Sequence, residues 1–213
     1  MDNRNLWSYI DHTLLKPTAA WEDIRAICAE GLEKGAASVC IPPSFVSRVR
    51  EAFSGLNICT VIGFPLGYNT TRIKAGETRE AIAEGAGEVD MVINLGDVKA
   101  GNFDAVTREI AAVREAAAGK ILKVIVETCY LTGAEKIALC GCVTSAGADY
   151  IKTSTGFGNA GAALEDITLF AKHIGPGVKI KASGGISTLE EFMAFIDAGS
   201  SRIGTSRGVQ ILG

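Results

Sequence analysis

The sequence predicts a barrel of eight parallel strands alternating with helices, the (β/α)₈ or TIM barrel. Eight short apolar, β-rich runs recur along the 213 residues, and segments with helical periodicity separate them. The runs are almost continuously apolar, which is typical of parallel strands covered on both faces. An open doubly wound sheet needs fewer strands and usually has a glycine loop after the first, but Leu15–Thr18 contains no glycine. The barrel is therefore favoured, as one domain over residues 1–213.

The expected strands are bounded by turn residues and helical segments, which gives each a length of four to eight residues. In chain order they are Ile10–Leu15, Ala37–Ile41, Ile58–Phe64, Glu88–Asn94, Ile121–Thr128, Asp149–Thr153, Val178–Ser183 and Ser201–Gly204.

Helix signals fill the intervals between these strands. Thr18 is a candidate cap for a helix that ends near Gly35. Its apolar residues repeat every three to four positions, as do those of a later helix before Gly119; the two stripes are Ile24, Ile27, Cys28 and Leu32, and Phe103, Val106, Ile110 and Val113.

Two four-residue patterns predict capping boxes, in which a hydroxyl and a carboxylate bind the free backbone N–H groups of a helix start. They are Thr132-x-x-Glu135 and Ser187-x-x-Glu190. The second is expected to open a helix that ends near Gly199 and turns three apolar residues toward the core: Phe192, Phe195 and Ile196.

Composition and charge exclude several classes of function. The net charge is -3, so neither nucleic acid nor an anionic membrane is an expected partner. Residues 1–15 lack the apolar core of a secretion signal, and no run approaches the roughly 20 apolar residues of a membrane span. The six cysteines are therefore expected to be reduced thiols of a cytoplasmic protein.

A metal site is not expected from the cysteine and histidine pattern. Cys140 and Cys142 form one close pair, but the sequence has no second pair, and His12 and His173 lie far from the first. A structural zinc site needs four such ligands. No other cofactor is indicated.

Lys152 is the leading candidate for a catalytic residue. It lies in Asp149–Phe157, after the apolar Ile151 and before hydroxyl residues and Gly156. A lone lysine at a strand end most often extends to water. A buried one needs compensation for its charge.

Other charged residues also interrupt apolar runs, where burial is costly unless the charge is paired. Asp90 lies within Glu88–Asn94, and Lys179 and Lys181 share a face of their strand by alternation. Lys123 and Glu127 are expected to share a face in the same way, and the first strand adds Asp11 and Thr13. Each has a structural explanation of its own, as a local pair, a cap or an outward residue. Their recurrence in several of the most apolar segments favours a functional cluster.

Glycine turns after the last strands predict a phosphate site. Ser183–Ile186 follows the seventh strand and Ile203–Ser206 the eighth. Barrels commonly bind phosphate there through backbone N–H groups. Ordinary turns are the alternative for each alone, but Gly156 in the sixth loop adds to the pattern.

A lysine in a water-poor barrel mouth can act as a nucleophile if its pKa falls from ~10.4 toward 7 or 8. Lys181 is a candidate for the neighbouring cation that lowers it. Such an amine can condense with a carbonyl to an iminium, an electron sink that permits carbon–carbon cleavage without a metal.

Ordered segments along nearly the whole chain carry these residues. They are Asp11–Leu15, Ser38–Ile41, Val61–Pro65, Glu88–Asn94, Lys123–Thr128, Tyr150–Phe157, Lys181–Ile186 and Ile203–Ser206. Together they resemble the deoxyribose-phosphate aldolase family. The resemblance implies reversible cleavage of 2-deoxy-D-ribose 5-phosphate to D-glyceraldehyde 3-phosphate and acetaldehyde, in the cytosol, by an enzyme that is often a dimer.

The resemblance also implies roles for residues. Lys152 corresponds to the Schiff-base lysine, Asp90 to a carboxylate that relays protons through a water, and Lys181 to the neighbour that tunes Lys152. Residues that match positions lining the family's pocket are Asp11, Thr13 and Lys123. Those that match its phosphate site are Gly156, Gly184, Gly185, Gly204 and Ser206.

This sequence departs from some family members at two places. Some carry a lysine where Phe157 stands here, which predicts weaker or altered phosphate binding. Some end in a tail whose tyrosine reaches the site, whereas this sequence ends at Val209–Gly213, so no tail tyrosine is expected to assist. Cys40 matches a cysteine that reactive aldehydes reach in some members, and a buried small hydrophobe is the alternative.

Two other functions remain open from the residues. One is a phosphosugar isomerase on the same barrel, with Glu127 as a carboxylate base and no covalent intermediate. The other is a barrel that binds a phosphosugar without turnover, in which the buried ionisable groups have no explanation.

Overall fold

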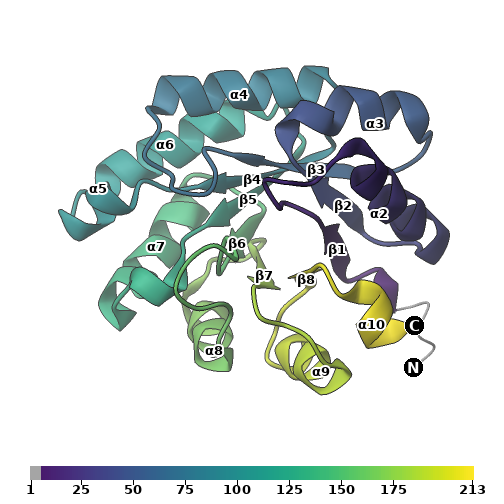
Figure 1. Cartoon of the computed structure of the whole chain (residues 1–213). Helices are drawn as coiled ribbons and strands as arrows, with labels where there is room; N and C mark the ends of the chain where they lie inside the picture. The colour runs from purple at the N-terminus through teal and green to yellow at the C-terminus, as the bar shows by residue number, and fades with distance from the viewer. Residues whose placement is uncertain (1–5) are drawn as a thin grey trace.

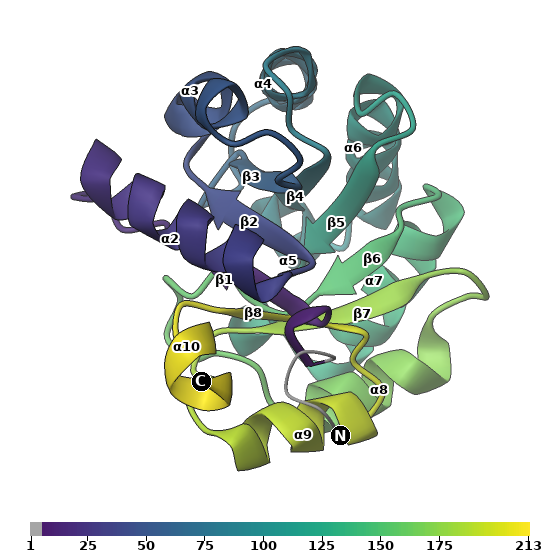
Figure 2. The ribbon, with the colours of Figure 1, turned by 90° about the vertical axis from the view of Figure 1, so that its right-hand side faces the viewer.

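A closed barrel of eight parallel strands forms the centre of the computed structural model, which describes residues 6–213 (Figures 1 and 2). Each strand pairs with its neighbours in sequence, and β1 closes the barrel against β8. The strands are β1 (Ile10–Thr13), β2 (Ser38–Ile41), β3 (Ile58–Ile62), β4 (Glu88–Val92), β5 (Ile121–Ile125), β6 (Tyr150–Lys152), β7 (Lys179–Ser183) and β8 (Arg202–Thr205). The predicted fold class is confirmed.

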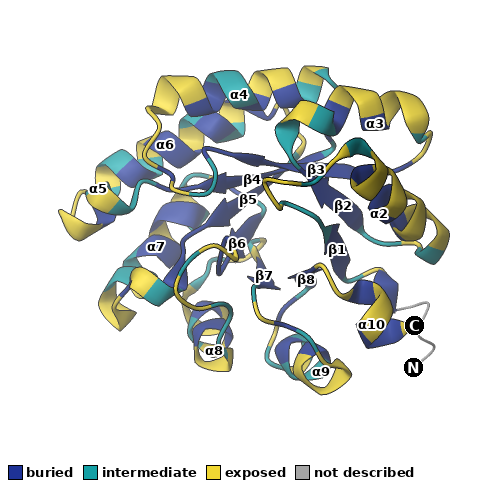
Figure 3. Cartoon of the chain, in the orientation of Figure 1, coloured by how far each residue is buried: buried dark blue, intermediate teal, exposed yellow. Residues whose placement is uncertain are grey.

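Helices surround the barrel, and each helix buries one of its faces against the strands. Figure 3 shows the strands almost entirely buried and the helices exposed on their outer sides. The helices are α2 (Trp21–Lys34), α3 (Val46–Ala52), α4 (Thr71–Ala83), α5 (Leu95–Lys99), α6 (Phe103–Ala116), α7 (Gly133–Ser145), α8 (Leu164–His173), α9 (Leu189–Asp197) and α10 (Gly208–Leu212), with 3₁₀ turns η1 (Pro43–Phe45) and η2 (Thr128–Tyr130). In residues 6–213 no helix combines the length and apolarity needed to cross a membrane. Residues 1–5, part of the segment tested above for a secretion signal, lie outside the described residues.

All eight expected strands are present, but several are shorter than predicted. The fifth ends at Ile125 rather than Thr128, because Glu127 adopts a left-handed conformation with φ 55° that a strand cannot continue. The prediction that Lys123 and Glu127 share a strand face is therefore wrong. Strand alternation also fails to bury Lys179, which is exposed where β7 begins.

The observed helix caps agree with the predicted ones only in part. Thr132 and Glu135 form the predicted capping box of α7. The cap of α2 is Ala20, not Thr18, since the Asp23 carboxylate accepts the Ala20 N–H at 2.9 Å. Gly35 ends this helix as predicted, with φ 72°.

The box of α9 lies one residue later than predicted. Thr188 and Glu191 form it, and the Glu191 carboxylate also accepts the Ser187 N–H at 2.8 Å. Neighbouring hydroxyl and acid residues offer two registers for a cap, and packing of Phe192 and Phe195 into the core selects one.

A buried ion pair ties α4 and α6 to the end of β4. The Lys74 Nζ donates to Glu109 Oε1 at 2.9 Å and to the Val92 carbonyl at 2.8 Å. Glu109 Oε2 accepts the Asn94 N–H at 3.2 Å. Lys74 is 0% and Glu109 5% exposed, so each charge depends on the other for compensation.

Replacing Glu109 with alanine is expected to destabilise the protein by about 3–5 kcal/mol, because it leaves a buried ammonium unpaired. Urea unfolding measures the change. The matched control is Glu115→Ala, an exposed residue of the same helix, for which less than about 0.5 kcal/mol is expected. The double variant Lys74→Met/Glu109→Leu removes both charges and is expected to recover much of the loss; equal destabilisation by the single and double variants contradicts the pairing argument.

Candidate active site

Charged side chains occupy the interior of the barrel, where apolar residues usually pack. They come from six strands and are buried in contact with one another. The carboxylates are those of Asp11, Glu88 and Asp90, and the cations are those of Lys123, Lys152, Lys181 and Arg202. Strand register places Asp90 beside Lys123 and Lys152 beside Lys181.

Asp90 is the centre of this network. Its Oδ2 accepts from Lys152 Nζ at 2.8 Å and from Lys181 Nζ at 2.7 Å. Its Oδ1 accepts from Lys123 Nζ at 2.8 Å and from the Cys59 thiol at 3.2 Å. One carboxylate therefore holds three amines that come from three different strands.

A second layer of charge lies deeper in the barrel. Asp11 Oδ2 bonds to Lys181, while its Oδ1 accepts from Arg202 and, at 2.6 Å, from the Ser38 hydroxyl. Glu88 bonds to Lys123 and to Arg202, with Arg202 Nη1 3.1 Å from Glu88 Oε2. Asp11 and Glu88 thus balance the cations that Asp90 does not hold alone.

Burial and the neighbouring charges oppose each other at these groups. Burial disfavours the charge on Asp90, but the amines of Lys123, Lys152 and Lys181 outweigh it and hold the pKa of Asp90 well below its usual range. Burial likewise opposes the charges of Lys123 and Lys181, yet Asp11 and Asp90 raise the pKa of each lysine above its ordinary value. Asp90 is therefore a carboxylate and Lys181 a cation at neutral pH.

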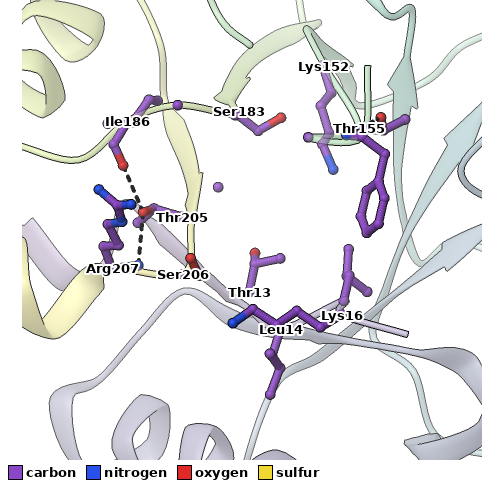
Figure 4. Close-up of a pocket in the computed structure, with 16 residues that line it drawn as sticks. Thr13, Leu14, Lys16, Lys152, Thr155, Ser183, Ile186, Thr205, Ser206 and Arg207 are labelled. Carbon is purple, nitrogen blue, oxygen red and sulfur yellow. Dashed lines mark hydrogen bonds between the residues drawn. The ribbon is translucent and has the colours of Figure 1, made fainter. Parts of the chain in front are cut away.

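A cavity of about 330 Å³ opens at the C-terminal ends of the strands, above this network (Figure 4). Lys152 points into it, 3% exposed. Seven of the predicted site residues line it: Lys152, Thr13, Gly156, Gly184, Gly185, Gly204 and Ser206. Asp90 and Lys181 lie beneath, bonded to or beside the amine of Lys152.

Two predicted pocket residues are placed elsewhere. Asp11 and Lys123 are both 0% exposed and lie below the cavity, where they hold Lys181 and Asp90 rather than line the wall. Sequence reasoning also missed Glu88 and Arg202 in the network and Lys16, Thr155 and Arg207 in the wall. Glu88 could have been found, because it alternates with Asp90 along one strand face.

The glycines of the predicted phosphate site serve different purposes. Gly156 and Gly185 have φ of 86° and 81° with open space where a side chain would begin, so their backbones face the cavity freely. Gly204 is constrained by packing, since an added Cβ would stand 2.9 Å from the Ser183 Cβ and 3.1 Å from the Lys181 Cε. Its lack of a side chain gives Lys181 the space to reach Asp90.

Glu127 braces the loop that follows Lys152. Its carboxylate, 2% exposed, accepts the Thr155 N–H at 3.2 Å and the Thr155 hydroxyl. The same hydroxyl accepts the Phe157 N–H at 3.0 Å. Because Glu127 does not line the cavity and its oxygens are bonded to the loop, the structure gives no support to Glu127 as an isomerase base.

Two sets of buried side chains are spaced closely enough to ligate a metal ion, which the sequence did not indicate: Cys40, Cys59 and Asp90, and Asp11, Cys59 and Glu88. The Lys123 ammonium already contacts members of both sets. It lies 3.3 Å from Cys59 Sγ, 2.8 Å from Asp90 Oδ1 and 3.4 Å from Asp11 Oδ2. Lysine therefore takes the position of a cation there.

A parallel barrel that presents a lysine to a cavity, with a carboxylate bound to its amine, has the groups that a class I aldolase uses. A family model for DeoC/LacD family aldolases matches residues 6–212. The deoxyribose-phosphate aldolase of Clostridium botulinum strain Alaska E43 is 59% identical over all of this chain and 96% of its own length, and that of Clostridioides difficile strain 630 is 50% identical over 98% and 96%. The chain belongs to the DeoC/LacD aldolase family.

Solved structures agree with this assignment. The deoxyribose phosphate aldolase of Aeropyrum pernix superposes with a TM-score of 0.91 at 33% identity, over 99% of this chain and 91% of its own. An orotidine 5'-phosphate decarboxylase from Pyrococcus horikoshii, at 13% identity and a TM-score of 0.66, shares the barrel alone.

The lowered pKa values of Asp90 and Asp11 predict how acid unfolds the protein. A carboxyl group whose pKa is lower in the folded than in the unfolded state stabilises the fold above its unfolded pKa, 3.8 here, and loses this contribution as pH falls toward the folded value. The free energy of unfolding is expected to fall steadily below about pH 4.

Urea unfolding between about pH 7 and pH 2.5 measures this dependence. Asp90→Asn is the comparison variant, since it cannot titrate at that position. It is expected to be less stable at neutral pH and to lose less further stability on acidification. Parallel pH curves for the two proteins would exclude Asp90 as a source of the dependence.

Proposed function

We propose that this aldolase reversibly cleaves 2-deoxy-D-ribose 5-phosphate to D-glyceraldehyde 3-phosphate and acetaldehyde through a Schiff base on Lys152. The observation that carries the proposal is the Lys152 amine, which points into the cavity while its Nζ lies 2.8 Å from a buried carboxylate. The names of the full-length relatives support the substrate.

The proposed reaction begins with attack of the neutral Lys152 amine on the aldehyde carbon of the open-chain sugar. Loss of water gives an iminium, which withdraws electrons as the bond between C2 and C3 breaks and the C3 hydroxyl loses its proton. Glyceraldehyde 3-phosphate leaves, and the remaining enamine is protonated and hydrolysed to acetaldehyde. The cationic iminium forms beside Asp90, whose buried carboxylate stabilises its charge.

Asp90 is proposed to relay protons, and Lys181 to supply a fixed positive charge. The amines around Asp90 lower its pKa and keep it in the carboxylate form. In the proposal this carboxylate orients a water that carries the protons. Lys181 shares the same oxygen at 2.7 Å and is held as a cation by Asp11 and Asp90. It thus places a fixed positive charge next to the reacting amine.

The glycine turns are proposed to hold the phosphate group. Gly156, Gly184 and Gly185 have positive φ and line the cavity. Gly204, in β8, and Ser206, just after that strand, also lie in its wall. Thr13 lines the cavity and donates its hydroxyl to the Asp11 carbonyl at 2.7 Å, which leaves its oxygen facing the ligand as an acceptor.

Borohydride reduction in the presence of acetaldehyde is expected to leave a stable N-ethyl group on Lys152, because reduction fixes the iminium as a secondary amine. Peptide mass spectrometry locates the modification. Lys152→Ala is expected to lower kcat by at least about 10³-fold. The matched control is Lys179→Ala, an exposed lysine of the adjacent strand, which is expected to keep the modification and the activity.

The same experiment separates the alternatives. An isomerase with a carboxylate base, or a barrel that binds without turnover, gives no trapped adduct. Preferential modification of another lysine over Lys152, or full activity in Lys152→Ala, contradicts the proposal.

The proposal extends to location and assembly. The six cysteines are free thiols, as expected for an enzyme of the reducing cytoplasm. Self-association into a dimer or larger homo-oligomer is also proposed; the Aeropyrum pernix relative is described as having a unique tetrameric structure. Analytical ultracentrifugation tests it.

A further inference from the structure

The cavity carries positive charge that no acid in its wall balances. Three cations line it, Lys16, Lys152 and Arg207, and among the described residues no Asp or Glu does. The charge of Lys152 is compensated from below by Asp90. The other two cations are therefore the ones available to an anionic ligand.

Lys16 and Arg207 are both exposed, and within residues 6–213 neither side chain forms an ion pair. Lys16 follows β1 and Arg207 follows β8, the two strands whose pairing closes the barrel. Barrel closure thus brings two cations that are far apart in sequence to the wall of the same cavity. In Figure 4 Arg207 lies at the left of the cavity and Lys16 along its lower edge, while Lys152 lies at the upper right.

The backbone beneath Arg207 is fixed to the neighbouring glycine turn. The Thr205 hydroxyl donates to the Ile186 carbonyl at 3.1 Å and accepts the Arg207 N–H at 3.0 Å (Figure 4). Thr205 is buried, so this link between the loops after β7 and β8 is shielded from water. Arg207 therefore starts from a defined position next to Gly185 and Ile186.

The wall beside Lys152 is uncharged by contrast. Phe157, in the loop that follows Lys152, lines the cavity and is 51% exposed, with its ring edge against Phe64 at a centroid distance of 5.4 Å. An aromatic ring offers contact area but no charge to a phosphate dianion. The cavity is therefore polarised, with a reactive amine and an apolar wall at one side and two free cations at the other.

We propose that Lys16 and Arg207 determine specificity for a phosphorylated substrate by binding its phosphate from the β1 and β8 side of the cavity. The glycine turns provide directed N–H donors, and the two side chains provide the charge that those neutral groups lack. Because the ligand's anionic end is drawn to this side, its carbonyl end is left facing Lys152. This inference rests on the proposed function and assigns the residues that select its substrate.

The test compares kcat/KM for 2-deoxyribose 5-phosphate and for unphosphorylated 2-deoxyribose. The ratio of the two is expected to fall about tenfold in Lys16→Met and in Arg207→Met, the factor that one charge-assisted hydrogen bond contributes, and about 100-fold in the double variant. The loss is expected mainly in KM, because the interaction is present in both the bound and the transition state.

Matched controls are Lys172→Met and Arg108→Met, exposed residues of α8 and α6 that lie outside the cavity wall. Both are expected to leave the ratio within about twofold of the wild-type value. A double variant of Lys16 and Arg207 with an unchanged ratio overturns the proposal and leaves the two as solvated surface charges. Equal losses on both sugars overturn it as well, since that result indicates a general structural role.

Thermal unfolding with added inorganic phosphate tests this inference separately from the proposed function. If the wild-type protein cleaves neither sugar, the aldolase proposal fails. The increase in Tm caused by phosphate then tests, independently of any activity, whether Lys16 and Arg207 bind phosphate. Stabilisation that is present in the wild type and the controls but lost in the double variant supports the pair. Equal stabilisation in all of them, or in none, overturns it.

Discussion

Compensation of buried charge in the barrel interior is the constraint on which the rest of this structure depends. Seven ionisable side chains lie there, four basic and three acidic, and removing a carboxylate leaves its cations uncompensated in a medium where isolated charges are costly. A neutral amine at Lys152, the form that attacks a carbonyl, leaves three cations against three carboxylates. The chemistry proposed for Lys152 therefore fits the charge balance of the network that holds it.

The barrel makes such a network possible because its closed sheet pairs the backbone and frees the interior for side chains. Gly204 gives Lys181 room to pass, and the left-handed turn at Glu127 redirects the chain so that its carboxylate holds the loop after Lys152. Both features restrict the backbone in order to position side chains of the site, not to improve core packing. They keep the reactive amine at the mouth while its partners stay below.

Along the cavity, covalent chemistry and anion binding are separated. Lys152 lies at the end of β6, whereas Lys16 and Arg207 follow β1 and β8. A substrate with a carbonyl at one end and a phosphate at the other matches this polarity. An overall net charge of -3 conceals it, since the local field of the cavity is positive.

The sequence by itself determined the eight strand segments, favoured the barrel and identified the candidates Lys152, Asp90 and Lys181, because apolar runs and the charges that interrupt them are local patterns. It could not show that Asp90 binds three amines at once, nor that Asp11 lies below the cavity. Those contacts join strands distant in sequence, and only barrel closure and register set them. For the same reason the cap of α9 lies one residue after its predicted position, and the pairing of Glu88 with Arg202 was not predicted. A sequence pattern describes neighbours along the chain, whereas tertiary packing decides which groups are in contact.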